Sequence, residues 1–220
     1  MSMLIRTFCL ATAPRRPVAA LSADIRALPG LQQAQLLRVL RHIPTDSVND
    51  SASAQAVPDA ERIQAVVELY FNDSAGAPQA ALMEWGAPVL FSFDSRPNIP
   101  VEPRGAAAQG GFRRWMLLVR KADTPEQFQG TWFGRHANLL KAMPHIDGYL
   151  QNLVTRRYDA QGREVDYATL PVDGIAEICF ADEAAMTASY TSDARLQLRD
   201  DGRALLERIT TVLVQGETLA

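Results

Sequence analysis

His136 is the residue of this chain best suited to acid–base chemistry, because an ordinary imidazole gains and loses its proton near neutral pH. Phe128, Trp132 and Met143 share its three- and four-residue spacing. This spacing places the four side chains on one helical face, whose apolar character predicts packing against a sheet. Phe128 and Trp132 could then line a substrate pocket or simply fill the core, and His136 could equally be a core histidine with a structural hydrogen bond.

Two polar residues that follow this helix, Tyr149 and Asn152, are further candidates for contacting a substrate. Each could equally make hydrogen bonds within a sheet. They stand three positions apart in a predicted strand, so strand alternation sends them to opposite faces unless a bulge intervenes. We therefore expect at most one of them to line any given pocket.

Glu68 and Glu177 are carboxylates inside apolar, strand-like runs. A buried carboxylate is costly unless it is paired. We expect a structural ion pair with an arginine across the sheet, such as Arg38 or Arg156, and the alternative is that Glu177 contacts a substrate.

Sequence motifs for metals and cofactors are missing. His42, His136 and His145 are scattered, and the two cysteines, Cys9 and Cys179, are too far apart to suggest a zinc site. No P-loop, dinucleotide loop or nucleophile elbow occurs. We therefore expect no metal and no cofactor. Both cysteines stand in apolar runs, which predicts buried, reduced thiols and a cytoplasmic protein.

The composition is that of a globular protein of 220 residues, with 47% apolar and 21% charged residues and a formal net charge of −3. No basic field exists to bind a nucleic acid or an anionic membrane, and the apolar runs are too short to span a bilayer. The first residues resemble a signal peptide only briefly, because Arg6 interrupts the apolar stretch, and a first strand explains them better.

Internal similarity suggests that the chain consists of two diverged copies of one unit. Three pairs of segments match in the same order, namely 28–41 with 143–156, 67–73 with 176–182 and, more weakly, 4–11 with 114–121. The stretch between the copies is rich in proline and glycine. The predicted division is a degenerate first unit at 1–96, a linker at 97–111 and a second unit at 112–220.

The predicted element order is β-α-β-β-α-β in each half. In the second half Thr124 caps a helix that begins at Pro125 and ends before Pro144. The other elements expected there are strands 112–120, 149–158, 174–180 and 209–214, a helix at 182–189 and an irregular or short helical segment at 195–206. In the first half we expect strands 3–11, 35–42, 63–71 and 89–93 and helices 17–28 and 78–85.

The second half resembles a known family, the EthD-like branch of the dimeric α/β-barrel superfamily, over about residues 112–217. The first half resembles it only through the second half. The resemblance is carried by the motifs Trp132-Phe133-Gly134-Arg135-His136, Met143-Pro144, GYLQNLV at 148–154 and DGIAEICFAD at 173–182.

The resemblance implies an α+β fold in which two ferredoxin-like βαββαβ units bring their antiparallel sheets together as a barrel. Because both units stand on one chain, we expect the barrel to form within the monomer, and two such monomers could pair further. Family pockets tend to lie between helices and sheet. In the first unit Leu21, Ala34 and Leu37 stand where the second has His136, Tyr149 and Asn152, so we expect one working pocket.

Related folds include lactone isomerases, polyketide cyclases, cofactor-free monooxygenases and haem enzymes, so the fold alone does not fix the reaction. The leading hypothesis is an EthD-like protein that binds a small hydrophobic or aromatic compound in the second unit, with His136 as acid/base or polar anchor. The alternative is a non-catalytic accessory or assembly partner of a degradation enzyme. A third hypothesis is haem binding through His136 or His145.

Overall fold

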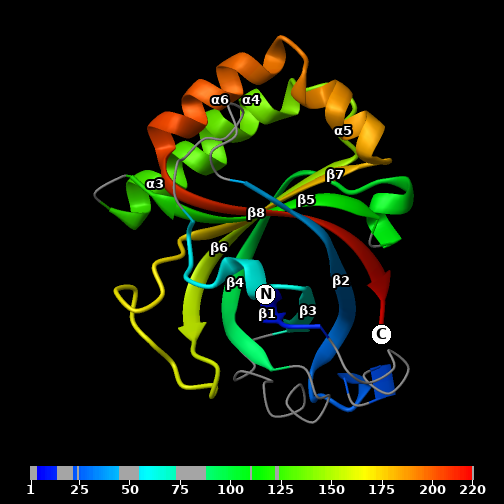
Figure 1. The fold of residues 1–220 in the computed structure, drawn as a ribbon, viewed down its shortest axis with the longest axis vertical. Helices are drawn as coiled ribbons and strands as arrows, with labels where there is room; N and C mark the ends of the chain where they lie inside the picture. The colour runs from blue at the N-terminus through cyan, green and yellow to red at the C-terminus, as the bar shows by residue number, and fades with distance from the viewer. Residues whose placement is uncertain are drawn as a thin grey trace.

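The computed structural model describes residues 4–13, 22–23, 25–44, 55–72, 88–109, 111–121 and 124–219. Within them, eight antiparallel strands close into one barrel, in the order β1-β3-β2-β8-β5-β7-β6-β4 and back to β1 (Figure 1). The strands are β1 (Leu4–Ala11), β2 (Leu31–Ile43), β3 (Ala65–Asn72), β4 (Val89–Val101), β5 (Phe112–Arg120), β6 (Gly148–Tyr158), β7 (Gly174–Phe180) and β8 (Leu206–Thr218).

The barrel consists of two equivalent four-stranded sheets, one from each half of the chain. The first half contributes β4-β1-β3-β2 and the second β8-β5-β7-β6, so the first, second, third and fourth strands of each half take the same places. The sheets join where β2 pairs with β8 and β4 with β6. The expected α+β fold, an antiparallel barrel formed within one chain, is confirmed, and the division into two repeated ferredoxin-like units stays a prediction.

The strands at these two joints are longer than the sequence pattern predicted. Strands β2, β4 and β8 each span 13 residues. The added residues of β4 pair with β6 and the last residues of β8 pair with β2, both across the joints, whereas residues 31–34 of β2 pair with β3 of the same half. Strand β4 continues to Val101 and so includes Pro97 and Pro100, which we had assigned to the linker. Proline fits an extended backbone, and its missing N–H is tolerated where the β4–β6 register shifts between Asn98 and Val101.

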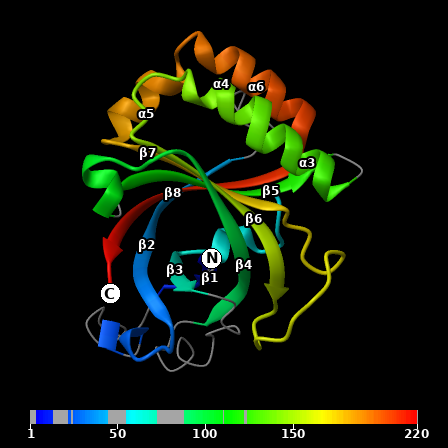
Figure 2. The same ribbon diagram turned by 180° about the vertical axis from the view of Figure 1, so that it is seen from behind.

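Helices of the second half cover one side of the barrel, above β5, β7 and β8 (Figures 1 and 2). They are α3 (Pro125–Thr131), a π-helical turn (Trp132–His136), α4 (Ala137–Lys141), α5 (Glu183–Tyr190) and α6 (Ala194–Leu205). Short 3-10 turns lie at Ala60–Arg62 and Gly105–Gln109. In the first half residues 22–23 and 25–26 are helical, within the helix expected at 17–28, and the helix expected at 78–85 lies outside the described residues.

Local sequence signals account for the helix boundaries. The Thr124 side chain accepts a hydrogen bond from the backbone N–H of Gln127, with Pro125 in the first turn, as predicted. Asp182 caps α5 in the same way. The segment after α5 is a regular helix, α6, rather than an irregular one, because Leu198, Asp201, Gly202 and Leu205 form a buried face at helical spacing.

Strand alternation separates the barrel interior from the face beneath the helices. On β5, Trp115 and Leu117 belong to the apolar cluster inside the barrel. Met116 and Leu118 belong to the cluster between sheet and helices. Each compartment therefore has its own set of side chains, and a candidate site must be assigned to one or the other.

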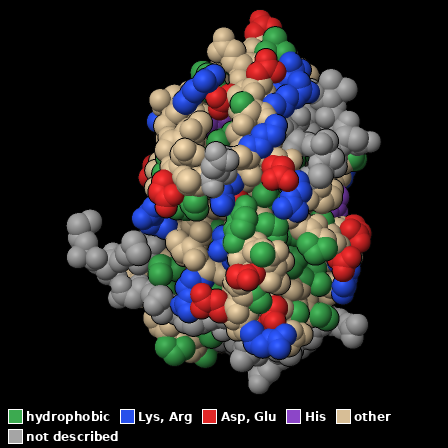
Figure 3. All heavy atoms as spheres, turned by 90° about the vertical axis from the view of Figure 1, so that its left-hand side faces the viewer, with side chains coloured by type: hydrophobic (Ala, Val, Ile, Leu, Met, Phe, Trp, Pro, Cys, Tyr) green, Lys and Arg blue, Asp and Glu red, His purple; other side chains and the backbone are tan. Residues whose placement is uncertain are grey.

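On the face shown in Figure 3, acidic and basic side chains are interspersed, with no field of one sign. Among the described residues, no helix is long and apolar enough to cross a membrane.

Candidate active site between the helices and the sheet

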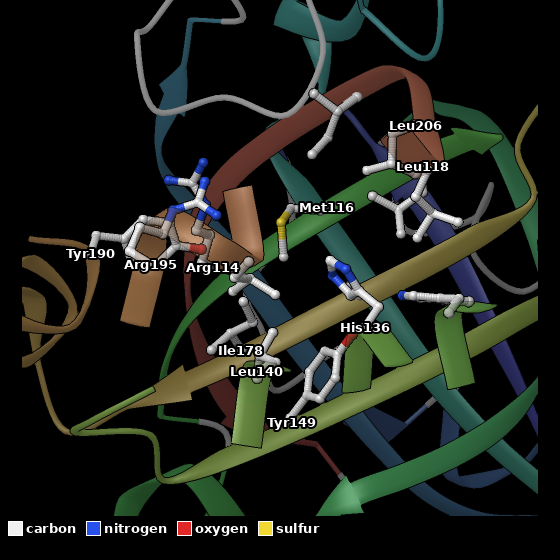
Figure 4. Close-up of a pocket in the computed structure, with 15 residues that line it drawn as sticks. Arg114, Met116, Leu118, His136, Leu140, Tyr149, Ile178, Tyr190, Arg195 and Leu206 are labelled. Atoms are coloured by element: carbon white, nitrogen blue, oxygen red, sulfur yellow. The ribbon is translucent and has the colours of Figure 1, made fainter. Parts of the chain in front are cut away.

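A cavity of about 40 Å³ lies between the helices of the second half and the outer face of β5, β7 and β8 (Figure 4). This volume has room for one or two water molecules. Apolar side chains form most of the wall, and the polar groups come from a few residues of different elements. The lining residues are Arg114, Met116, Leu118, Trp132, His136, Leu140, Tyr149, Ala176, Ile178, Tyr190, Arg195, Leu198, Leu205, Leu206 and Ile209.

His136 projects from the π-helical turn into this cavity, and its side chain is only 12% exposed (Figure 4). Its Nδ1 lies 2.8 Å from Oδ2 of Asp201, a buried residue of α6. The other oxygen of Asp201 forms an ion pair with Nε of Arg135, at 2.9 Å, and the Arg135 side chain is exposed. The carboxylate is therefore held from both sides, and it fixes the orientation of the imidazole.

Burial lowers the pKa of His136 below its usual 6.5, although Asp201 opposes this effect. The imidazole is therefore neutral at neutral pH. A carboxylate can only accept, so Nδ1 carries the ring proton and donates it to Asp201, and Nε2 keeps its lone pair. A neutral, oriented imidazole beside an apolar cavity is the arrangement that a general base requires.

Tyr149 reaches the same cavity from β6 (Figure 4). Gln151 donates through Nε2 to the Tyr149 hydroxyl at 2.9 Å and to the backbone oxygen of Trp132 at 2.7 Å. Asn98 donates to the Gln151 carbonyl at 2.6 Å and fixes that amide. Burial raises the pKa of Tyr149, so its hydroxyl stays protonated and can donate a hydrogen bond into the cavity.

The two aromatic residues predicted on the helix differ in their positions. Trp132 lines the cavity, whereas Phe128 packs behind it with ring centroids 5.1 Å apart. The indole lies directly on the backbone of Gly174, where an added Cβ would stand 2.5 Å from Cη2 and Cζ3 of the indole. The glycine of the DGIAE run is thus explained by the close approach of Trp132 to β7.

Asn152 and Glu177 lie apart from this cavity, inside the barrel. Arg6 donates to Asn152 at 2.8 Å and pairs with Glu177 at 2.8 Å, and Arg113 pairs with Glu177 at 2.5 Å. Glu68 pairs with the same two arginines at 3.2 and 3.3 Å. Tyr149 and Asn152 do point to opposite sides of β6, as strand alternation predicted.

The expectation of a structural ion pair for both glutamates is confirmed, but the predicted arginines were wrong. Arg38 and Arg156 are exposed and pair with Glu217 and Glu164 at the surface. The interior arginines are Arg6 of β1 and Arg113 of β5, and both side chains point into the barrel at the level of the glutamates. Spacing along the sequence cannot predict the register between strands, so it could not predict which arginines face the glutamates.

The two glutamates of the interior network differ in the direction of their pKa shifts. Burial and the neighbouring Glu177 raise the pKa of Glu68 to about 7. Burial also opposes ionisation of Glu177, but the charges of Arg6 and Arg113 outweigh it and lower the pKa of that carboxyl. Near neutral pH the network therefore holds one ionised glutamate, Glu177, and one that is close to its titration point.

The site also includes residues that the sequence pattern did not single out, namely Arg114, Tyr190 and Arg195 in the cavity wall and Asp201 as the partner of His136. Three of these lie on α5 and α6, whose helical character was only partly predicted. The spacing of Leu198, Asp201 and Leu205 is the signal that could have placed Asp201 on the buried face of a helix.

The remaining histidines stand elsewhere. His145 is exposed in a turn with φ 62°, and His42 makes a 2.9 Å contact to the backbone oxygen of Ile63. No cluster of three metal-ligating side chains occurs among the described residues. A haem group does not fit the cavity at His136, because about 40 Å³ is far smaller than a haem.

In the first unit, Ala34 is buried on the outer face of its sheet and Leu37 inside the barrel. They occupy the faces that Tyr149 and Asn152 occupy in the second unit. Leu21, the counterpart of His136, lies outside the described residues.

Comparison with solved structures defines the class of the fold as the dimeric α/β barrel. An anthrone oxidase-like protein matches with a TM-score of 0.56 and 10% identity, over 100% of this chain and 94% of that chain. A candidate monooxygenase of Fusobacterium nucleatum matches with a TM-score of 0.58 and 6% identity, over 100% and 94%. A candidate monooxygenase of Lactobacillus acidophilus matches with a TM-score of 0.53 and 10% identity, over 100% and 98%. At these identities the likeness concerns the fold.

Within this class the family model of the EthD domain matches residues 121–208. The matched segment includes helices α3 to α6 and strands β6 and β7, with His136 and Asp201, whereas β5 with Arg114, Met116 and Leu118 lies before it. No curated protein matches the chain in sequence.

Proposed function

We propose that this EthD-like protein is a small-molecule enzyme in which His136, oriented by Asp201, transfers a proton to and from a hydrophobic or aromatic compound bound in the cavity. The observation that carries the proposal is the His136–Asp201 pair at the wall of a cavity whose lining residues are mostly apolar. Chemistry of the isomerase, cyclase or lyase type needs such a group, and cofactor-free oxygenation, with O₂ as co-reactant, begins with the same deprotonation.

In the proposed step, Nε2 of His136 accepts a proton from an acidic C–H or O–H bond of the substrate. The electron pair of that bond stays on the substrate as an enolate or phenolate. The imidazolium that forms is stabilised by Asp201, and the Tyr149 hydroxyl can donate a hydrogen bond to the developing oxyanion. Return of the proton at another carbon would complete an isomerisation.

Substrate entry requires the cavity to open, because about 40 Å³ cannot hold an aromatic ring. The walls that would move are the side chains of Met116, Leu140, Leu198 and Leu205. Methionine and leucine side chains repack easily around a ligand, whereas the hydrogen-bonded His136 and Tyr149 would keep their places.

The name of one structural neighbour agrees with this substrate class. Anthrone, named in the anthrone oxidase-like protein, is an aromatic ketone with an acidic C–H bond.

The two buried, unpaired thiols Cys9 and Cys179 support the cytoplasmic location proposed for the protein. Pairing of two chains stays a prediction, to be tested by light scattering coupled to size-exclusion chromatography.

The test is solvent deuterium exchange into 2-tetralone, a small aromatic ketone with an acidic C–H bond, followed by NMR. We expect the wild-type protein to accelerate exchange and His136→Gln to lower that acceleration by about 10²–10⁴-fold with folding retained. His145→Gln, a change at an exposed turn, serves as the matched control. Equal exchange in the two variants would refute the role of His136.

A non-catalytic accessory role is the second candidate, and the small volume of the cavity is the observation that favours it. This role predicts no acceleration of exchange by the wild-type protein. It also predicts that aromatic ketones leave the NMR signals of the cavity methyl groups, such as that of Met116, unchanged.

A further inference from the structure

A second and larger pocket lies where β5 ends and β7 begins. Its volume is about 290 Å³, whereas the cavity at His136 measures about 40 Å³, and this larger size approaches that of ordinary small-molecule pockets. In Figures 1 and 2 the loop that follows β6 lies on the same side of the barrel as α3, and both contribute to the pocket wall. The lining residues are Arg120, Pro125, Phe128, Leu153, Val154, Arg157, Tyr167 and Asp173.

Tyr167, on the loop between β6 and β7, organises the polar part of this pocket. Its ring lies against two guanidinium groups, with Cζ of Arg120 at 4.4 Å and Cζ of Arg157 at 5.2 Å from the ring centroid. Its hydroxyl donates a hydrogen bond to Oδ2 of Asp173 at 2.9 Å. The tyrosine therefore holds two cationic side chains and one carboxylate together at the pocket wall.

The charge of Asp173 is neutralised by Arg120. Oδ1 of Asp173 pairs with Nη1 of Arg120. Oδ2 accepts hydrogen bonds from the backbone N–H of Arg120, at 2.9 Å, and from the Tyr167 hydroxyl. Both carboxylate oxygens are thus engaged, and this ion pair adds no net charge to the pocket.

Arg157 supplies a positive charge that this ion pair does not balance. Its Nε and Nη2 donate to the backbone oxygens of Leu170 and Val172, at 3.0 and 2.8 Å, and it forms no ion pair with a carboxylate of the described residues. Burial lowers the pKa of Arg157, and the opposing charge of Asp173 does not outweigh it. Neutral carbonyl groups and an aromatic ring offset only part of the cost of a partly buried cation, so an anion would be favourable here.

The shape and chemistry of the pocket indicate which anion would fit. Nη1 of Arg157 makes no hydrogen bond to the described residues, so its two N–H groups can serve a ligand. A planar guanidinium matches a carboxylate in geometry as well as in charge. The rest of the wall is apolar and comes from Pro125, Phe128, Leu153 and Val154. One surplus cation beside an apolar wall suits a small molecule with one carboxylate on an apolar ring.

We propose that this pocket binds a small aromatic carboxylate, whose anionic group pairs with Arg157 and whose ring packs against Phe128 and Leu153. The pocket is separate from the cavity at His136, since the two share no lining residue. The proposal therefore goes beyond the proton-transfer role of His136 and does not rest on it.

The experiment compares two probes of the same shape on the full-length protein, benzoate and the neutral benzamide. Binding is followed by isothermal titration calorimetry. We expect the wild-type protein to bind benzoate at least about tenfold more tightly than benzamide, because hydrogen bonds between two charged groups are stronger than those to a neutral one. Equal affinities, or no binding of either probe, would overturn the inference without any need for a variant.

The position of benzoate is measured on the wild-type protein by nuclear Overhauser effects between its ring protons and labelled methyl groups. We expect contacts with the methyl groups of Leu153 and Val154, which line this pocket. Contacts with the methyl groups of Leu140 and Ile178 would instead place the ligand in the cavity at His136 and would overturn the assignment.

Variants then test the role of the surplus charge. Arg157→Gln should reduce the ratio of the two affinities toward one, whereas Arg157→Lys, which keeps the charge, should retain most of the preference. The matched control is Arg156→Gln, because the neighbouring Arg156 is exposed and pairs with Glu164 at 2.6 Å at the surface. Circular dichroism confirms folding of each variant. A ratio that falls equally in the control, or that survives in a folded Arg157→Gln, would contradict the proposal.

Discussion

Replacing Gly174 by alanine tests the contact that positions Trp132 over β7. An added Cβ would lie 2.5 Å from two carbons of the indole, about 1 Å closer than the optimal separation of carbon atoms. Trp132 has no room to move away, since it is fully buried and stacked on Phe128 at 5.1 Å. We expect Gly174→Ala to lower the free energy of unfolding by about 1–3 kcal/mol, as for other overpacked cores.

Urea denaturation followed by circular dichroism measures this loss, and thermal unfolding should show a midpoint lower by about 2–4 °C for each kcal/mol. Gly130→Ala is the control, because this exposed helical glycine has no atom within 4 Å of an added Cβ and should become more stable by about 0.5–1 kcal/mol. Adding Trp132→Leu to Gly174→Ala should relieve the clash in a double-mutant cycle. A loss of stability in Gly174→Ala that is unaffected by the second substitution would refute the reasoning.

Three further predictions concern titratable groups. Glu177→Gln should lower the free energy of unfolding by about 3–5 kcal/mol, because it leaves the two interior arginines without their ionised partner. In the same urea denaturation experiment, Glu164→Gln at the surface should change this free energy by less than about 0.5 kcal/mol. Glu68 has a folded-state pKa of about 7 against 4.5 unfolded, so its contribution to stability is present below pH 4.5 and is lost as pH rises through about 7. Glu68→Gln should therefore remove this slope from a plot of unfolding free energy against pH, and a slope identical to that of the wild type would contradict the pKa. The rate of deuterium exchange catalysed by the wild-type protein should rise with pH and reach its plateau below pH 6.5, since burial lowers the pKa of His136. Asp201→Asn should reduce the rate at this plateau, because the imidazole loses the carboxylate that orients it.

The sequence predicted the fold well because hydrophobic periodicity is strong in the second half. Strands β5 and β7 begin and end at the predicted residues, and the α3 cap at Thr124 follows from its side chain and the proline after it. The ends of β2, β4 and β8 were underestimated because they are supported by strands that are distant in the sequence, from the same half or from the other. Such long-range pairing leaves no local pattern in the sequence.

The site was only partly predictable for a similar reason. His136 and Trp132 could be assigned to one helical face from their own spacing, and the structure brings both to the cavity that Tyr149 also lines. Asp201, which contacts His136, and Arg195, which lines the cavity, come from a helix that is distant in sequence, and nothing in the local pattern pairs them with His136. Strand alternation separated Tyr149 from Asn152, but it could not say which of the two would face the helices.

The second unit borders two compartments, the barrel interior and the cavity beneath the helices. The difference between them suggests how a barrel with two similar sheets can have a single candidate site. Inside the barrel, charges from both units are mutually dependent, because Arg6 and Glu68 of the first unit pair with Glu177 and Arg113 of the second. The helix-side cavity, in contrast, is lined only by residues of the second unit. In a barrel made of two identical chains every substitution would change both cavities at once. Two units on one chain can differ, and Ala34 stands on one outer face where Tyr149 stands on the other. The shared interior must therefore tolerate less change than the outer surface, in keeping with the contrast expected between Glu177→Gln and the exposed Glu164→Gln.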